Sequence, residues 1–234
     1  GSERFYSQPY RRCNDSVSAV LRVTSYTEPE GLKSMTTIVL ASQSTSRRRL
    51  LESAGLSPTI IVSHVDEETD FFNSLSPADM VIALAITKAH TVREQIDFPA
   101  IIIGCDSTFE FDGQSLGKPG SPEVATERAK RVRGNSGLLH TGHCIIDTSK
   151  DIEISDRVTT RVTFDHMTDE EIADYVATEE PLHVAGGFTL DGFSSPFIPS
   201  IEGDYTNIVG ISMPFVRKAF ANLGYSWPEV KAMK

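Results

Sequence analysis

Long hydrophobic runs are absent from this sequence. No apolar stretch reaches the roughly 18–20 residues that a helix needs to cross a bilayer, and the run from Ala100 to Gly104 is short enough for a buried strand. The first residues are polar, and no apolar segment of the signal-peptide type follows them. We therefore expect a cytoplasmic protein with neither a membrane span nor a secretory signal.

Positive charge and cysteine are also scarce. The formal net charge is −10, which argues against a protein that coats nucleic acid or binds a membrane surface, because both need a positive face. An acidic protein can still hold a nucleotide through a few cations and a bound metal. The three cysteines, Cys13, Cys105 and Cys144, match no zinc-binding spacing. Cys105 and Cys144 lie in apolar stretches, so we expect buried free thiols in a reducing compartment.

Several motifs of known enzyme classes are missing as well. The sequence has no Gly-x-Ser-x-Gly elbow, no Walker loop and no Gly-x-Gly-x-x-Gly after a strand. Their absence argues against an α/β-hydrolase, a P-loop NTPase and a dinucleotide-binding fold. His140 and His143 are spaced like metal ligands, but they lie in a strand-like run, and we expect them to be strand residues.

The chain divides near residue 35. Gly1-Ser2 resembles a remnant of tag removal, and residues 3–34 are polar without a sustained period, so we expect residues 1–34 to be a tag remnant and a polar N-terminal extension. Residues 35–234 are expected to form one folded domain. A chain of 234 residues with 39% hydrophobic content is long enough for one core, or for one domain with two lobes.

Strand and helix patterns alternate through this folded part. Apolar or alternating runs predict strands at 37–41, 59–63, 100–104, 138–146 and 158–164. Serine caps, proline at the first helical position and a capping box predict helix starts near residues 46, 77, 122, 169 and 214, the last helix closing at Gly224. Asp112-Gly113 is a hairpin-turn signal. The mixture of alternation and hairpins predicts the α/β class with a mixed sheet.

The first candidate site is an anion site at residues 40–48. A strand ends there, Ser42, Ser44 and Ser46 turn the chain, and Arg47 lies in the first turn of a helix. The free N–H groups and positive end of a helix attract anions. Arginines are unfavourable at that end unless an anion is bound, which favours a phosphate-binding loop over the alternative of a solvated basic turn with serine caps.

Carboxylates and lysines supply further candidates. Asp66-Glu67-Glu68 follows a strand and could hold Mg²⁺ or Mn²⁺, although acidic clusters are more often only solvated. Asp106 directly follows the predicted strand 100–104, at the edge where α/β proteins bind ligands, and could activate water or cap a turn. Lys118 lies between Gly117 and Pro119 and could contact a phosphate or belong to a surface turn.

Two weaker signals complete the set. Lys88 lies inside a predicted helix and indicates little by itself. The segment 185–192 holds three glycines in eight residues, which permits either a close approach to a base or sugar, or simply a tight turn.

Taken in order, these segments resemble the Maf family of nucleoside triphosphate pyrophosphatases, over about residues 35–223. The sequences at residues 105–107 and 185–192 resemble those of the actinobacterial branch of this family. The matching motifs are Leu40-Ala41-Ser42-Gln43-Ser44 with Arg47-Arg48, Asp66-Glu67, Leu84-Ala85 with Lys88-Ala89, Gly104-Cys105-Asp106-Ser107, Leu116-Gly117-Lys118-Pro119, Thr141-Gly142, Ala185-Gly186 and Asn207-Ile208-Val209-Gly210.

The resemblance implies a fold and a reaction. The fold would be a twisted mixed sheet with flanking helices and two lobes around a cleft, similar to inosine-triphosphate pyrophosphatases. The reaction would convert a nucleoside triphosphate and water to a monophosphate and pyrophosphate with a divalent cation, Mg²⁺ or Mn²⁺, as in the house-cleaning of non-standard nucleotides. By resemblance, the catalytic and metal-binding residues would be Asp106 and Glu67, and the phosphate contacts would be Ser42, Ser44, Arg47, Lys88 and Lys118.

Three positions depart from the members specific for dTTP and UTP. Those members carry Arg, Thr and Gln where this chain has Ser46, Ser107 and Asp191. All three positions are linked to base choice, so the pyrimidine preference does not carry over. Because a carboxylate only accepts hydrogen bonds, Asp191 would suit a base edge rich in N–H donors, such as guanine or a methylated purine.

Two rival functions stay open. One is a nucleotide-binding regulator of cell division with little or no turnover, and the other is a nonspecific phosphatase that releases orthophosphate. The presence of Asp106, Glu67 and the phosphate-binding cations favours the enzyme. The expected partner is a nucleoside triphosphate, with neither a nucleic acid polymer nor a membrane, and a homodimer is expected from the resemblance alone.

Overall fold

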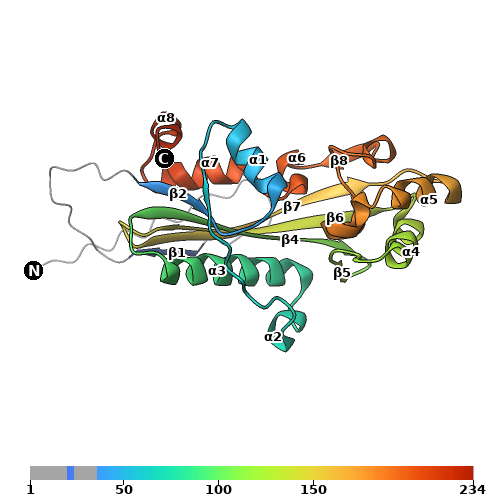
Figure 1. Cartoon of the computed structure of the whole chain (residues 1–234), viewed down its shortest axis with the longest axis horizontal. Coiled ribbons are helices and arrows are strands. Elements are labelled where there is room, and N and C mark those ends of the chain that lie inside the picture. The colour runs from blue at the N-terminus through green and yellow to red at the C-terminus, as the bar shows by residue number, and fades with distance from the viewer. Residues whose placement is uncertain (1–19, 24–35, 234) are drawn as a thin grey trace, which may run out of the picture.

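The computed structural model describes residues 20–23 and 36–233 of the chain. Within this part, eight strands form one mixed sheet, and helices cover both of its faces (Figure 1). The strands are β1 (Val20–Val23), β2 (Thr37–Leu40), β3 (Thr59–Ile60), β4 (Ala100–Phe111), β5 (Gln114–Leu116), β6 (Ser136–Asp147), β7 (Ile152–Thr163) and β8 (Ser200–Glu202). The predicted α/β class with a mixed sheet is confirmed.

The α-helices are α1 (Thr45–Ser53), α2 (Asp70–Asn73), α3 (Pro77–Gln95), α4 (Pro122–Val132), α5 (Asp169–Ala177), α6 (Tyr205–Val209), α7 (Met213–Asn222) and α8 (Trp227–Lys231). Five of the eight α-helices in the described residues begin within one residue of a predicted start, and α2, α6 and α8 were not predicted. Three 3₁₀ turns are η1 (Glu180–His183), η2 (Ala185–Gly187) and η3 (Ser195–Phe197). Ser76 caps α3, Ser121 caps α4 and Thr168 closes the expected capping box of α5.

The sheet has the strand order β1-β7-β6-β4-β2-β3, with β5 added to β4 and β8 added to β7. Strand β2 is parallel to β3 and β4, and the other pairs are antiparallel. Strands β4, β6 and β7 are each twelve residues long. They run from one end of the molecule to the other and join its two lobes (Figure 1).

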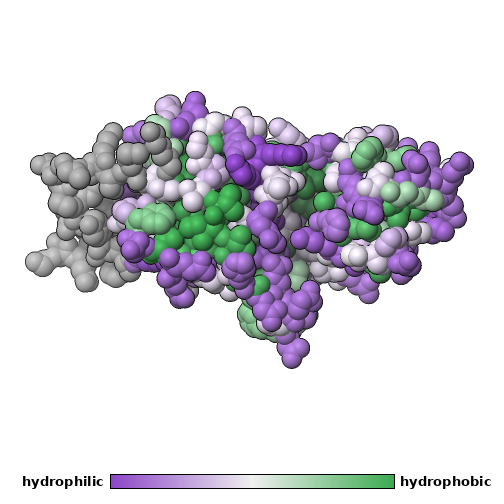
Figure 2. Space-filling view, in the orientation of Figure 1, coloured by the Kyte–Doolittle hydropathy of each residue, from purple (hydrophilic) through white to green (hydrophobic). Residues whose placement is uncertain are grey.

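Each lobe has its own hydrophobic packing. In the first lobe, α1, α7 and α8 cover one face of the sheet and α3 covers the other. In the second lobe, β5, α4 and α5 gather around the far ends of the long strands. Hydrophilic side chains cover much of the face shown in Figure 2, and an apolar area lies above α3. The predicted arrangement of two lobes is confirmed.

The side chains of β4 alternate between the two faces. Ile101, Ile103 and Cys105 pack in the cluster that contains α7, whereas Ala100 and Ile102 pack in the cluster that contains α3. Because successive strand residues point to opposite faces, the next two polar residues of β4 must also diverge. One of them faces α3 and the other faces α1.

Several predicted boundaries were wrong. Strand β4 does not stop at residue 104 but continues to Phe111, because β6 pairs with it as far as Glu110 after its parallel partner β2 has ended opposite Ile103. Asp106 therefore lies inside a strand and not after one. Strand β3 has two residues instead of five, and α8 follows the helix that was expected to be the last.

The predicted N-terminal extension lies mostly outside the described residues, and so do Gly1-Ser2 and Cys13. Within residues 1–34 the structure describes Val20–Val23 alone, which pairs antiparallel with β7 from Val20 opposite Ser155 to Val23 opposite Ile152. The division of the chain near residue 35 stays a prediction.

Helix α3 approaches the sheet closely above two glycines. A Cβ atom on Gly104 would lie 2.3 Å from the carbonyl oxygen of Ala85, and one on Gly142 would lie 2.1 Å from that of Val81. Backbone atoms at such distances cannot be avoided by a change of rotamer. The two glycines therefore set how near α3 lies to β4 and β6.

We expect Gly142→Ala to lower the free energy of unfolding by about 1–3 kcal/mol or more, because the added methyl group must push α3 off the sheet. Chemical denaturation monitored by circular dichroism measures the effect. Gly117→Ala is the matched control, since a Cβ there meets no atom within 4 Å. Equal stability of the two variants would contradict the close packing of α3.

Candidate active site

A cavity of about 1350 Å³ lies between the two lobes. The first lobe contributes the loop after β2, the start of α1 and one side of α3, and the second contributes segments around residues 114–118 and 183–191. The predicted cleft is therefore present. Every site residue predicted from the sequence lines it: Ser42, Ser44, Ser46, Arg47, Glu67, Lys88, Asp106, Ser107, Lys118 and Asp191.

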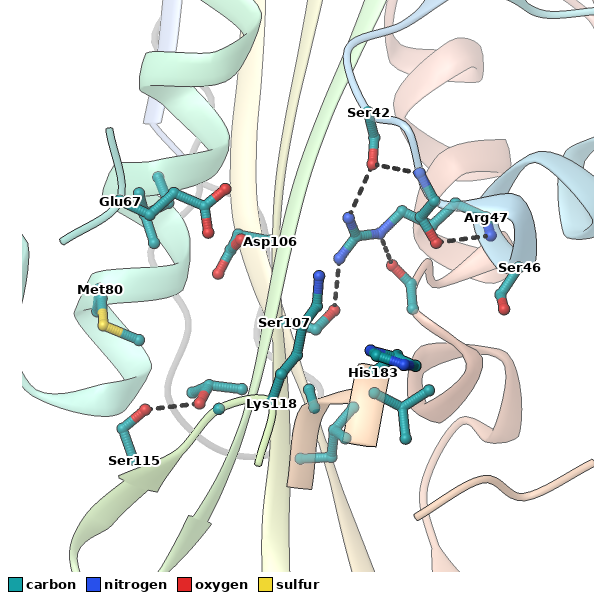
Figure 3. A pocket seen from close by; sticks show the side chains of 18 of the residues that line it. Ser42, Ser46, Arg47, Glu67, Met80, Asp106, Ser107, Ser115, Lys118 and His183 are labelled. Atoms are coloured by element: carbon teal, nitrogen blue, oxygen red, sulfur yellow. Dashed lines mark hydrogen bonds between the residues drawn. The ribbon is translucent and has the colours of Figure 1, made fainter. Parts of the chain in front are cut away.

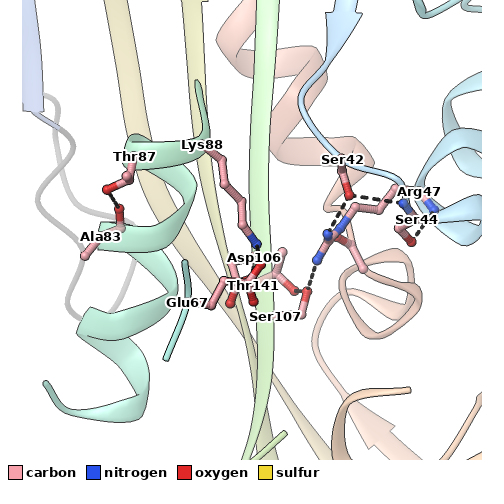
Figure 4. A network of polar contacts seen from close by, with 11 residues as sticks. Ser42, Ser44, Arg47, Glu67, Ala83, Thr87, Lys88, Asp106, Ser107 and Thr141 are labelled. Atoms are coloured by element: carbon pink, nitrogen blue, oxygen red, sulfur yellow. Dashed lines mark hydrogen bonds and ion pairs between the residues drawn. The ribbon is translucent and has the colours of Figure 1, made fainter. Parts of the chain in front are cut away.

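An acidic centre occupies the α3 side of β4 (Figure 4). The Nζ atom of Lys88 lies 2.6 Å from Oδ1 of Asp106 and 2.7 Å from Oε1 of Glu67. Lys88 and Asp106 are buried, whereas the side chain of Glu67 is half exposed. Helix α3 supplies the lysine, β4 supplies Asp106, and the segment before α2 brings in Glu67. The sequence predicted all three residues but not their direct contact.

The environment of Asp106 favours a proton-accepting role. Burial raises the pKa of its carboxyl group, and this effect is larger than the opposing effects of Lys88 and Arg47. A carboxylate whose pKa is raised toward neutrality is a better general base than an ordinary exposed one. Asp106 also lines the cavity, where a proton acceptor would be accessible to a ligand.

A cationic centre occupies the opposite side of β4. The guanidinium of Arg47 donates from Nε to the carbonyl oxygen of Gly210 at 2.7 Å, from Nη1 to Ser42 at 3.1 Å and from Nη2 to Ser107 at 2.9 Å. Arg47 is 9% exposed, so these contacts fix its plane. A guanidinium has five N–H donors, and two of them remain for a ligand. The geometry accounts for an arginine in the first turn of α1.

Two hydroxyl groups, those of Thr141 and Ser107, determine which atoms donate and which accept hydrogen bonds beside Arg47. The Thr141 hydroxyl donates to the carbonyl oxygen of Asn207 at 3.1 Å, so its single hydrogen is used. The Ser107 hydroxyl lies 2.9 Å from that of Thr141 and must donate to it. Ser107 therefore accepts from Arg47 and has no hydrogen left for a substrate. Its role lies within this network, as Figure 4 shows.

The loop before α1 is arranged to donate to an anion. The Ser42 hydroxyl accepts from the backbone N–H of Ser44 at 3.2 Å and also from Arg47, so its own hydrogen is free to point at a ligand. Ser44 is the N-cap of α1, and its side chain accepts from the N–H of Arg47. Ser44 is thus a capping residue. The first N–H groups of α1, at Thr45 and Ser46, point out of the helix start.

The second lobe adds one more cation to the cavity. Lys118 is exposed and has no ion-pair partner among the described residues, and its side chain extends toward the Arg47 network in Figure 3. Arg128 of α4 donates to the carbonyl oxygen of Gly117 at 2.6 Å and so fixes the turn that carries Lys118. Ser46 and Asp191 lie at the cavity wall without such bonds.

Sequence reasoning gave no role to three residues that build the site. Thr141 and Asn207 hold Ser107, and the amide of Asn207 also donates to the carbonyl oxygens of Leu139 and Val158. Gly210 presents its carbonyl group to Arg47 with a φ of 124°, a conformation that favours glycine. The motifs Thr141-Gly142 and Asn207 to Gly210 marked these positions, but no local pattern indicates contacts between residues so far apart.

The two strand histidines are structural, as expected from the sequence. His140 lies on β6 between Thr159 and Glu110, each at 2.8 Å from a ring nitrogen. His143 is fully buried and accepts a hydrogen bond from the backbone N–H of Ser212 through Nε2 at 2.9 Å. Burial, assisted by Arg47, lowers the pKa of His143 from the usual 6.5 to about 3.

This pKa predicts a loss of stability in acid. Below pH 6.5 the unfolded chain binds a proton at His143 that the folded protein does not, so stability falls between pH 6.5 and about 3, by up to about 1.4 kcal/mol per pH unit. His143→Gln should reduce this slope in denaturation curves measured across that range. His183→Gln, at an exposed position, should leave it unchanged. An unaltered slope in His143→Gln would contradict the assignment.

The acidic centre fits a divalent cation that is shared with a substrate. Among the described residues no group of three or more His, Cys, Asp or Glu side chains could hold a metal by itself. Asp106 and Glu67, however, each place a carboxylate oxygen within 2.7 Å of the same atom, Nζ of Lys88. Mg²⁺ is commonly bound by one or two carboxylates together with substrate phosphates and waters, and this pair meets that requirement.

Cys105 and Cys144 are buried free thiols, as predicted. No helix in the described ranges combines the length and the apolar character needed to cross a membrane.

Comparison with known proteins decides the family. Residues 37–223 match the family described as Maf-like protein. This chain belongs to the Maf family. Two relatives, each called nucleoside triphosphate pyrophosphatase, come from Streptomyces coelicolor and Streptomyces avermitilis. The first is 49% identical over 196 residues, covering 83% of this chain and 94% of that protein. The second is 51% identical over 188 residues, covering 80% and 90%.

The Streptomyces relatives confirm the predicted resemblance to actinobacterial Maf proteins. A solved structure, that of the Staphylococcus aureus Ham1 protein, is similar with a TM-score of 0.43 and 12% identity, covering 81% of this chain and 100% of that one.

Proposed function

We propose that this chain is a nucleoside triphosphate pyrophosphatase, which hydrolyses its substrate between the α and β phosphates. The products would be a nucleoside monophosphate and pyrophosphate. One observation carries the proposal: a buried carboxylate–ammonium centre and an arginine-based anion site face the same cavity from opposite sides of β4. The names of the Maf relatives support the same reaction.

The residues of the chain take complementary roles in this reaction. Asp106 accepts a proton from the water whose oxygen forms a bond to the α-phosphorus, while the bond to the β-phosphate oxygen breaks and pyrophosphate leaves. Arg47, Ser42 and the N-terminus of α1 donate to phosphate oxygens, and Lys118 adds a positive charge from the other lobe. Preorganised donors of this kind stabilise the charge that develops in the transition state.

Asp106 and Glu67 would hold the divalent cation, Mg²⁺ or Mn²⁺. When bound, the cation neutralises charge on the phosphate oxygens. Lys88 belongs to the same centre and is the group there that could contact a phosphate oxygen.

Base selection would depend on Ser46 and Asp191. Both line the cavity with free side chains, whereas the hydroxyl of Ser107 is used by Arg47 and Thr141. Ser107 would then influence selectivity only through the position of Arg47. The carboxylate of Asp191 favours a base edge with N–H donors, such as that of guanine or a methylated purine. Faster turnover of pyrimidine triphosphates than of every purine triphosphate would contradict this part.

A product assay tests the reaction. The protein is incubated with Mg²⁺ or Mn²⁺ and a panel of standard and modified nucleoside triphosphates, and the products are separated by chromatography. Pyrophosphate with monophosphate, lost in Asp106→Asn, would support the proposal. Orthophosphate would indicate a nonspecific phosphatase. Binding without cleavage under either metal would favour the regulator of cell division.

Two further properties belong with this function. We place the protein in the cytoplasm, where free nucleotides and reduced thiols occur together. We also propose a homodimer, supported by the apolar area above α3 (Figure 2), and sedimentation velocity at several concentrations tests it. A single monomeric species at all of them would exclude the dimer.

A further inference from the structure

Lys88 is the counter-ion of two carboxylates at once. Its ammonium nitrogen lies 2.6 Å from Oδ1 of Asp106 and 2.7 Å from Oε1 of Glu67. The side chains of Lys88 and Asp106 are only 9% and 11% exposed, so water screens their attraction poorly. A buried carboxylate is costly without such a partner. The ammonium therefore holds the centre together.

The other cations of the cavity have different partners. Arg47 is bonded to a carbonyl oxygen and to two hydroxyl groups. Lys118 has no carboxylate partner among the residues that the structure describes. Of the three cations predicted from the sequence to contact phosphate, Lys88 is therefore the one that pairs with the carboxylates of the acidic centre.

The same two carboxylate groups, those of Asp106 and Glu67, would serve two positive groups. A divalent cation held by Asp106 and Glu67 would have to use the carboxylates that Lys88 now neutralises, and the two positive charges repel each other. A cation would therefore bind there more tightly once the ammonium has moved away. The phosphates of a substrate would offer the ammonium new anionic partners and so permit that movement.

We propose that Lys88 is an internal counter-ion that keeps metal affinity low until a triphosphate enters the cavity. The inference rests on the proposed function, because it takes a triphosphate as the ligand that draws Lys88 away. Metal and substrate then bind cooperatively, and each raises the affinity for the other by the same factor. The empty enzyme would hold little metal at ordinary concentrations.

Titration of the nucleotide-free protein with Mn²⁺ tests this idea. Isothermal calorimetry compares the wild type with Lys88→Met, which is nearly equal in length and carries no charge. We expect the variant to bind Mn²⁺ about tenfold more tightly, in the range typical of coupled sites. Lys118→Met removes an equal charge from the same cavity and should leave the affinity close to that of the wild type.

Two results would overturn the proposal. One is an unchanged Mn²⁺ affinity in Lys88→Met, and the other is an equal gain in Lys118→Met, which would indicate a general effect of charge. Thermal melting checks that the variant is folded. If it is not, Lys88→Gln keeps a donor toward Asp106 without the charge and replaces it in the same titration.

Two separate measurements distinguish failure of the counter-ion proposal from failure of the proposed enzymatic reaction. Pyrophosphate release is measured on the wild type alone, whereas the titration uses no nucleotide. A gain in Mn²⁺ affinity without turnover in the wild type would support the counter-ion and overturn the proposed reaction. Turnover by the wild type, with an unchanged Mn²⁺ affinity in the Lys88 variants, would support the proposed reaction and overturn the counter-ion.

Discussion

Replacing Asp106 by asparagine is expected to lower kcat by about 10²–10⁴-fold, the usual contribution of a general base. The substitution keeps the shape of the side chain and a contact with Lys88, but an amide oxygen cannot take the proton from water. Because Lys88 still pairs with Glu67, the variant should remain folded. Steady-state release of pyrophosphate measures the effect.

Asp66→Asn is the matched control for this experiment. Asp66 precedes Glu67 in the sequence, is exposed, and accepts a hydrogen bond from the backbone N–H of Glu68. Its replacement should leave kcat nearly unchanged. If Asp66→Asn and Asp106→Asn had equal effects, the loss would come from the general negative charge at the cavity, and Asp106 would not be the base.

Arg47→Lys should lower kcat/KM by about 10²–10³-fold, comparable to the loss of a donor that stabilises a transition state. A lysine retains the positive charge, but its single nitrogen cannot reach Gly210, Ser42 and Ser107 together and also face a phosphate. The variant therefore separates the geometry of the guanidinium from its charge. Initial rates at low substrate concentration give kcat/KM directly.

Arg48→Lys provides the comparison on the next residue. Arg48 is exposed and pairs with Glu52 one turn later in α1, and exposed pairs of this kind contribute little. We expect nearly wild-type kinetics. A large loss in Arg48→Lys, with little loss in Arg47→Lys, would mean that the anion site uses the outer face of α1 and that the buried network is only structural.

The chemistry of the site was more predictable than its geometry. Residue type and motif order were enough to predict that Ser42, Arg47, Lys88 and Asp106 belong to one site, and all four line the cavity. The contact of Lys88 with Asp106 could not be predicted, since it depends on how closely α3 approaches the sheet. That approach is set by Gly104 on β4 together with Gly142 on the neighbouring strand β6.

The length of β4 is a second feature that could not be predicted from the sequence. Its apolar run ends near Gly104, and polar residues beyond that point suggest a loop. The strand nevertheless continues, because the backbone groups of Asp106 and its neighbours find partners on β6, where Asp106 lies opposite Gly142. Local patterns report the burial of side chains, whereas the end of a strand also depends on hydrogen bonds to residues far along the chain.

The placement of Asp106 and Ser107 on opposite faces of β4 has a consequence for how the family can tolerate change. An insertion or deletion of one residue between Ile103 and Asp106 would reverse the face of every later side chain in the strand. The carboxylate would then point at Arg47 and the hydroxyl at Lys88, although no functional residue had been replaced. We therefore expect relatives to accept changes of length in the turn after β4 far more readily than within the strand β4 itself.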